Sequence, residues 1–209
     1  MATNVSHSEF TQLASESQIE KTVQALQAHG IHTVVFETGE EASKYVLDLI
    51  PDGAKVYDSP SRTCEAIGLT EQIEQAHHFQ AVRAQLALLD YVAQRDERRK
   101  LVATPDILVG SVHAITEQGE VLIASGTGSQ LGSAAYSASR AIWVVSTQKL
   151  VPTLEDGLRR IRERCLPLES ERSQQVYGQP SAINKLLIIN AEHEAGRLTI
   201  VLVKQQLGF

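Results

Sequence analysis

Three short apolar runs mark the centre of the chain: Ile107–Val109, Val121–Ala124 and Ile142–Val145. Each is rich in β-branched residues and bounded by Gly, Ser or Thr, which is typical of buried strands. The segment Ser129–Arg140, between the second and third runs, is dense in Ala and Ser and long enough for one helix. Because α/β proteins bind ligands in the turns between such elements, we expect any functional site to lie here.

The first part of the chain alternates in the same way. Apolar positions at helical spacing predict a helix from Ser15 to Gly30, and the β-branched run Thr33–Phe36 predicts a strand. A second helix follows over Glu40–Ile50, and a short strand over Lys55–Tyr57. This order predicts a parallel pair of strands with a right-handed crossover.

The remaining pattern completes an α/β chain. A longer helix is expected over Phe79–Ala93, and another over Thr153–Cys165, with Thr153 as its cap. The segment Leu166–Pro180 has no periodicity and is expected to be a loop. Two strands, Leu186–Ile189 and Leu198–Val203, form a terminal hairpin or a paired edge. About seven strands that alternate mainly with helices predict an α/β fold.

Composition limits the class of protein. The chain has 209 residues and a net charge of −6, which suits one globular domain and argues against a nucleic-acid-binding surface. No apolar run is long enough to cross a membrane, and Met1–Gln12 is not a secretory signal. Two cysteines, Cys64 and Cys165, cannot form a disulfide framework or a four-cysteine metal site. We expect a cytoplasmic protein with a flexible N-terminus over residues 1–14 and a single domain over residues 15–209.

The first candidate site is the loop after the strand at Lys55–Tyr57. Ser59, Ser61, Arg62 and Thr63 combine free backbone amides at a helix start with a guanidinium, which together attract an anion. A millimolar ligand needs about 4 kcal/mol, whereas a helix terminus alone supplies roughly 0.3–1 kcal/mol. A second loop would therefore have to contribute. The alternative is a capped helix with a surface arginine.

The second candidate is the turn Ser125–Ser129, which contains Gly126, Thr127 and Gly128. Glycine lets the backbone approach a ligand closely. The turn is neither a complete dinucleotide-binding motif nor a P-loop, and a plain tight turn is the alternative. Both candidate loops follow strands, so we expect them to converge at one edge of the sheet, with their amides directed into a shared hollow.

The third candidate is Glu117, which lies between an apolar segment and Gly119. A carboxylate in this setting could act as a base or a nucleophile. Alternatively, it caps backbone donors or pairs with Arg62 or Arg140. His113 lies nearby, but no second His or Cys stands at ligand spacing, so we expect no metal site.

Several of these motifs together resemble the LUD-domain family, which is named for lactate utilisation. The resemblance rests on Asp106–Gly110, on His113–Gly119 with its Ala-Ile-Thr-Glu-x-Gly element, and on Gly126-Thr127-Gly128. It covers roughly residues 15–209 and extends to the Ile-Gly-Leu turn and the closing Leu-Gly-Phe. It implies a Rossmann-like, mainly parallel sheet flanked by helices, similar to the sugar-phosphate isomerase and CoA-transferase fold group. In the related CoA-transferases a glutamate before a glycine turn carries the acyl group, and Glu117 resembles it.

The chain departs from the family pattern at several positions. His113 replaces an asparagine, and Ser125–Gln130 lacks a carboxylate and an arginine of the usual turn. Longer members belong to an iron–sulfur system that oxidises lactate to pyruvate, but Arg172–Lys185 contains none of the cysteines found there. We therefore do not expect this chain to hold a cluster itself, although iron–sulfur oxidoreductase subunits are candidate partners.

Three hypotheses follow. The first is a subunit or accessory of lactate utilisation that binds a small anionic metabolite between the Ser59 and Gly126 loops, beside Glu117. The second is an acyl-transferase or isomerase that uses Glu117. The third is a non-catalytic interaction module with an eroded site. The identity of any cofactor stays open, and a homodimer is expected only from the fold group.

Overall fold

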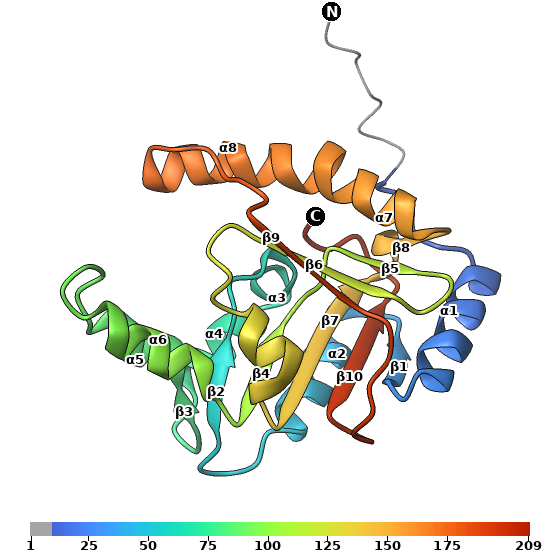
Figure 1. The fold of residues 1–209 in the computed structure, drawn as a ribbon. Helices are drawn as coiled ribbons and strands as arrows, with labels where there is room; N and C mark the ends of the chain where they lie inside the picture. The colour runs from blue at the N-terminus through green and yellow to red at the C-terminus, as the bar shows by residue number, and fades with distance from the viewer. Residues whose placement is uncertain (1–9) are drawn as a thin grey trace, which may run out of the picture.

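The computed structural model describes residues 10–209 and contains two sheets (Figure 1). The larger sheet has six strands, and every neighbouring pair in it is parallel. Its strands, in spatial order, are β1 (His32–Phe36), β10 (Leu198–Val203), β7 (Arg140–Ser146), β4 (Ile107–Gly110), β2 (Lys55–Asp58) and β3 (Gln80–Ala81). Two of the three apolar runs predicted as buried strands, Ile107–Val109 and Ile142–Val145, lie at its centre in β4 and β7, whereas the third, Val121–Ala124, lies in the smaller sheet.

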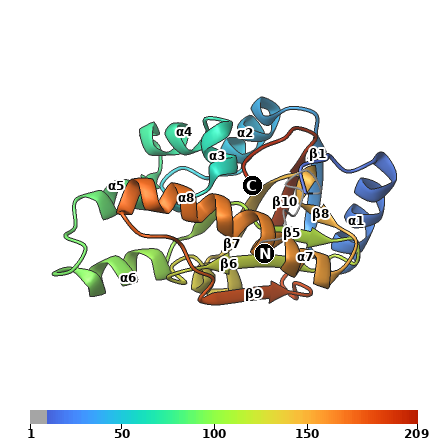
Figure 2. The same cartoon turned by 90° about the horizontal axis from the view of Figure 1, so that it is seen from above.

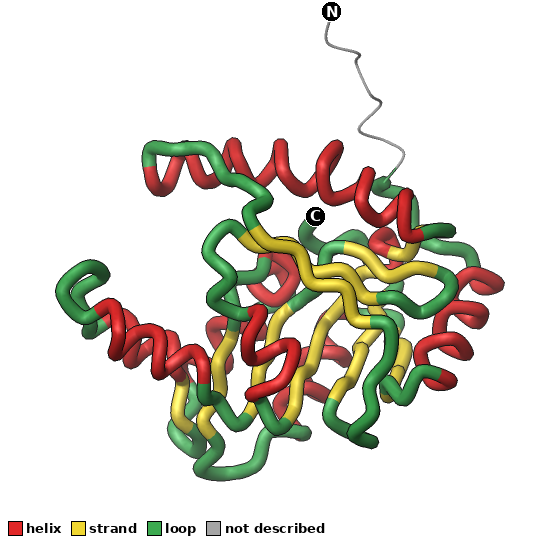
Figure 3. The backbone as a smooth tube through the Cα atoms, viewed as in Figure 1, coloured by secondary structure: helices red, strands yellow, loops and turns green. Residues whose placement is uncertain are grey.

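The smaller sheet has four strands and mixed directions. In spatial order they are β8 (Leu150–Val151), β5 (Ala114–Thr116), β6 (Val121–Ser125) and β9 (Lys185–Ile189). The β5–β8 pair is parallel, whereas β6 runs antiparallel to both β5 and β9. This sheet crosses one face of the larger sheet near the ends of β7 and β10 (Figure 3).

Helices cover the outer faces. They are α1 (Glu16–Ala28), α2 (Gly39–Asp48), α3 (Arg62–Ala66), α4 (Leu69–Gln75), α5 (Val82–Ala87), α6 (Arg95–Ala103), α7 (Leu154–Arg160) and α8 (Leu166–Tyr177). Short turns of other helix types are η1 (Ser133–Ser137), η2 (Thr147–Lys149) and η3 (Ile161–Cys165). Capping boxes at Ser15 and Thr38 begin α1 and α2, because each side chain accepts a hydrogen bond from the backbone N–H three residues later.

The side chains of the central strand β7 divide the core into layers. Trp143 and Val145 point toward the smaller sheet and α1, whereas Ile142 and Val144 point toward α2, α3 and α4. A third apolar cluster joins the outer face of the smaller sheet to α7 and η3. The layers are therefore helices, large sheet, small sheet, and α7 with η3. Seen from above, α2, α3 and α4 lie on one side of the strands and β9 on the other, and α8 passes over the middle (Figure 2). The predicted fold class, a mainly parallel sheet flanked by helices, is confirmed.

The helix expected within Ser129–Arg140 is present but short, because only residues 131–137 are helical, mostly as η1, and β7 begins at Arg140. Several other local predictions are wrong. The expected loop at Leu166–Pro180 is mostly α8, and the expected helix over Phe79–Ala93 is divided into β3 and α5. The terminal strands do not form a hairpin, since β9 and β10 belong to different sheets. Strands β1 and β2 share a parallel sheet but are not adjacent.

At the N-terminal end of the described chain, Phe10 is buried against the smaller sheet, and the guanidinium of Arg159 lies 5.6 Å from the centre of its ring. Phe10 falls within the N-terminal segment expected to be flexible, whose first nine residues lie outside the described part. Among residues 10–209, no helix is long and apolar enough to span a bilayer.

Candidate functional site

The chain passes from the large sheet to the small sheet at two neighbouring places. Residues 111–113 join β4 to β5, and η2 joins β7 to β8. The two crossings lie side by side because β4 pairs with β7 and β5 pairs with β8. Lys149 is the last residue of η2, so its side chain starts from one crossing and reaches the other.

Lys149 is buried and makes three hydrogen bonds through its amine. Nζ donates to Thr63 Oγ1 at 2.9 Å, to Ser111 Oγ at 3.0 Å and to the Val112 carbonyl at 3.2 Å. Burial lowers the pKa of Lys149 from 10.5 to about 7, and the positive charge of Arg160 acts in the same direction. The amine therefore exists in both protonation states near neutral pH.

Arg160, at the end of α7, is the second buried cation. Its Nη1 donates to the His113 carbonyl and lies 3.1 Å from Cys165 Sγ. Its Nε and Nη2 are buried and have no hydrogen-bond partner within residues 10–209. Burial lowers its pKa, but a guanidinium stays charged at neutral pH. Two donors of a fully buried cation are thus left over.

The charges of both cations act on His113. Its Nδ1 accepts a hydrogen bond from the Ala124 backbone N–H at 3.2 Å. Loss of hydration and the charges of Lys149 and Arg160 hold the pKa of His113 well below its ordinary value. The imidazole is therefore neutral at pH 7 and adds no positive charge.

Neither Lys149 nor Arg160 forms an ion pair with an acidic side chain within the described residues. Buried charges in proteins are normally paired, because removing an ion from water costs several kcal/mol, in order of magnitude. An anion placed here would supply the missing negative charge and acceptors for Nε and Nη2. The charge and the unused donors are of the kind that a small carboxylate or a similar anion would satisfy.

The C-terminal segment closes one side of this cluster. Thr63 Oγ1 donates to the Leu207 carbonyl at 3.3 Å, and Gln148 Nε2 donates to the carbonyls of Leu207 and Gly208. Gly208 has a φ of +62°, and a Cβ there would lie 2.6 Å from Thr63 Oγ1. Glycine is therefore required for this close approach. Ser111 and His113 are half-buried.

The first predicted loop contributes one residue to the cluster, Thr63. Ser61 accepts a hydrogen bond from the Cys64 backbone N–H at 3.2 Å and so caps the short helix α3. Ser59 Oγ donates to the Val109 carbonyl at 3.2 Å. Arg62 points outward and pairs with Glu65 at the surface.

The second predicted loop satisfies its own amides. Gly128 N donates to Ser125 Oγ at 2.8 Å, and Ser129 N donates to Thr127 Oγ1 at 3.3 Å. The Gly126 carbonyl accepts a hydrogen bond from Asn184 at 3.1 Å. Ligand-binding roles for Gly126, Thr127 and Gly128 stay predictions.

Glu117 lies away from both loops. It follows the end of β5, whereas His113 precedes the start of that strand, and Figure 1 shows this hairpin end beside α1. Its carboxylate accepts from Lys21 Nζ at 2.6 Å and from Gln18 at 3.3 Å, and these contacts lower its pKa. Gly119 packs against the α1 backbone. The structure does not bring Glu117 to the Lys149 cluster, and its nucleophilic role stays a prediction.

Two further buried titratable groups, Asp58 and Cys64, lie close to Thr63 in the sequence. Cys64 Sγ donates to the Gly110 carbonyl at 3.4 Å, and burial raises the pKa of its thiol to about 12. Burial also raises the pKa of Asp58 to about 6, against the opposing effects of Thr70 and Arg83. Cys64 is therefore a thiol at neutral pH, which makes it a poor nucleophile.

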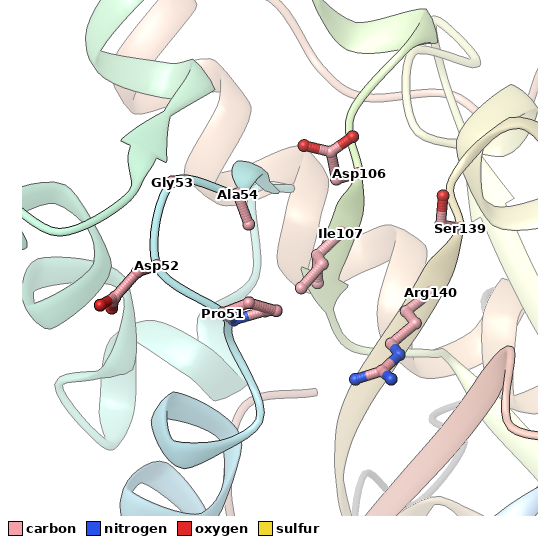
Figure 4. A pocket seen from close by; sticks show the side chains of 8 residues that line it. All are labelled: Pro51, Asp52, Gly53, Ala54, Asp106, Ile107, Ser139 and Arg140. Carbon is pink, nitrogen blue, oxygen red and sulfur yellow. The ribbon is translucent and has the colours of Figure 1, made fainter.

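An open hollow of about 460 Å³ lies at the opposite end of the strands of the large sheet (Figure 4). Its side chains come from the amino ends of β2, β4 and β7 and include Asp52, Asp106 and Arg140. It contains none of the predicted site residues. Within residues 10–209, no group of three His, Cys, Asp or Glu side chains could hold a metal ion.

The sequence analysis missed Lys149 and Arg160. A weak signal existed for each: Lys149 stands in a short polar segment between two apolar runs, residues 141–145 and 150–151, and Arg160 shares a helix face with Gly157. Gly157 packs so tightly that a Cβ there would lie 2.9 Å from Leu122 Cδ2. That contact presses the helix, and with it Arg160, against the smaller sheet.

The fold and the site define an α/β protein with a buried cationic cluster between two sheets. A family model for the LUD domain matches residues 19–203. The chain therefore belongs to the LUD-domain family, as its motifs predicted.

Among solved structures, the chain is similar to a DUF162 family protein from Deinococcus radiodurans. The TM-score is 0.56 at 13% sequence identity, over 92% of this chain and 99% of the other. This likeness shows a shared fold. A D-ribose-5-phosphate isomerase in complex with phospho-erythronic acid gives a TM-score of 0.41 at 15% identity, over 81% of this chain and 95% of the other. No curated protein matches the chain.

Proposed function

We propose that this protein acts in lactate utilisation by binding a small carboxylate at the cluster of Lys149 and Arg160. One observation carries the proposal: two buried cations have no acidic partner among residues 10–209, and Arg160 keeps two donors without acceptors. Lactate and pyruvate offer one negative charge and two acceptor oxygens in a small volume. A guanidinium fork matches that geometry.

Binding is tested by calorimetric titration with lactate, pyruvate and inorganic phosphate at low salt. We expect Arg160→Met to weaken carboxylate binding by about tenfold to a hundredfold, because a hydrogen bond to a charged group contributes about 1.5–3 kcal/mol. Arg160→Lys, which keeps the charge, should lose less. Amide NMR spectra report whether each variant is folded.

The matched control is Arg62→Ala, which removes a surface guanidinium that pairs with Glu65. It should leave binding unchanged. If Arg62→Ala or Gly126→Val abolishes binding whereas Arg160→Met does not, the ligand lies at the two predicted loops. If none of the three anions binds at millimolar concentration, the proposal is wrong.

A second candidate function is an interaction module. It is favoured by three exposed apolar side chains near the connection between α5 and α6: Leu88 is 85% exposed, Tyr91 66% and Val92 71%. A patch of this kind suits a protein partner, such as an iron–sulfur oxidoreductase subunit. This function predicts a copurifying partner and no small-molecule ligand. Sedimentation of the purified protein would distinguish a homodimer from a monomer.

A further inference from the structure

We propose that Lys149 is an imine-forming lysine, whose amine condenses with the carbonyl carbon of a 2-oxo acid such as pyruvate. The inference rests on the proposed function, because the same cluster must first hold the carboxylate of the acid. It goes further in assigning a covalent step and in separating ligands that carry a ketone from those that carry only a carboxylate.

The contacts of Nζ favour this chemistry. An amine paired with a carboxylate is held in its protonated form and cannot attack a carbonyl, but Nζ contacts only two hydroxyls and one carbonyl, at 2.9–3.2 Å. Burial also moves its pKa into the neutral range, where part of the amine is unprotonated. Three donated hydrogen bonds describe the ammonium form. In the unprotonated amine, one of the two hydroxyls donates to Nζ instead and has to turn away before Nζ attacks a carbonyl carbon.

The neighbours of Nζ provide the other parts of the reaction. Nζ forms a bond to the carbonyl carbon and gives a carbinolamine. The C–O bond then breaks and water leaves, with protons moved through the Ser111 or Thr63 hydroxyl, so that amine and ketone become imine and water. No oxidant or further reactant is needed.

Arg160 and the surrounding packing account for selectivity. Arg160 is held by the carbonyl of His113, and Lys149 by the carbonyl of the preceding residue, Val112. Both cations are therefore anchored to one short connection between β4 and β5, close enough for the charge of Arg160 to act on Lys149. Ser111, which contacts Nζ directly, is only half-buried.

The experiment treats the full-length protein with pyruvate and sodium borohydride, followed by intact mass measurement and peptide mapping. Reduction traps the imine as a stable amine, so we expect one adduct with the mass of pyruvic acid less one oxygen atom, located on Lys149. Lactate has no ketone and should give no adduct. Acetone, which lacks the carboxylate, should react at least about tenfold more slowly.

The controls separate the two proposals. Lys149→Arg has no primary amine and should give no adduct, and the Lys100→Arg control should react like the wild type. If lactate and pyruvate both bind but borohydride leaves Lys149 unmodified, the imine is refuted and the anion site stands. If neither acid binds and no adduct forms, both proposals fail. Labelling spread evenly over surface lysines such as Lys55 and Lys185 also refutes a specific site.

Discussion

Replacement of Lys149 by methionine should remove a specific part of the pH dependence of stability. The pKa of Lys149 falls from 10.5 to about 7 on folding, because burial disfavours the charged form. Between these pH values the unfolded chain binds more protons than the folded protein. The wild-type free energy of unfolding should therefore rise with pH across this range, and below pH 7 the contribution is constant.

The magnitude follows from the shift. One pKa unit corresponds to roughly 1.4 kcal/mol, so Lys149 should add about 2 kcal/mol between about pH 7 and about pH 8.5. This window lies below the unperturbed pKa values of Cys64 and Tyr57. Burial raises the pKa of both groups in the folded protein, so their titration lowers the free energy of unfolding only at higher pH. The window lies above the range in which Asp58 titrates.

Urea unfolding at the two pH values measures the effect. Lys149→Met should lack the increase of about 2 kcal/mol, whereas Lys100→Met, which changes an exposed lysine of α6, should keep it. Methionine has a similar length and suits a buried position. Equal pH slopes for wild type and Lys149→Met would show that the lysine is charged in the folded protein, contrary to the reasoning above.

Two further predictions concern Gly208, which borders the cluster, and Glu117, which lies away from it. Gly208→Ala should cost about 1–3 kcal/mol, because its Cβ would lie 2.8 Å from the Thr63 backbone nitrogen and its φ is positive. Thermal unfolding and faster amide exchange in residues 204–209 would reveal it, and unchanged exchange would contradict it. Glu117→Gln should cost less than about 1 kcal/mol, because Lys21 is largely exposed, and it should leave carboxylate binding unaltered. Loss of binding in this variant would place Glu117 back in the site.

The predictable part of the fold is the part encoded by local apolar runs. Runs such as Ile107–Val109 and Ile142–Val145 are strands because their β-branched side chains are buried on both faces. Sheet membership could not be predicted in the same way. The last two strands look alike in sequence, yet β9 pairs with β6 and β10 with β1 and β7, which depends on partners far along the chain.

The two helical segments differ from expectation for different reasons. In the Ala-rich segment only residues 131–137 are helical, and there Arg197, from a distant part of the chain, donates to the carbonyls of Ala134, Ala135 and Ala138. Helix α8 has a mostly polar sequence without periodicity, but it continues directly from α7 and η3. Its first turns therefore need no nucleation of their own.

The site was missed for a related reason. Composition and spacing describe a lysine by its neighbours in sequence, and most lysines lie at the surface. Lys149 is buried because two crossings between sheets meet, and that meeting depends on the pairing of β4 with β7 and of β5 with β8. Thr63 and His113 were predicted on other grounds and contact the cluster, one through its hydroxyl and the other through its carbonyl.

The unused donors of Arg160 are the feature that a purely structural role explains least. Neutral donors or well-packed apolar side chains could join the two crossings, and replacing buried ionic groups in this way is often neutral or stabilising. The cluster instead combines an amine, a guanidinium and a neutral imidazole, with two guanidinium donors unused among the described residues. Under the proposed function, an anion bound here would lower the cost of burying both charges and would use those donors. Such a ligand would give a reason for charged side chains at positions where apolar ones would fold at lower cost.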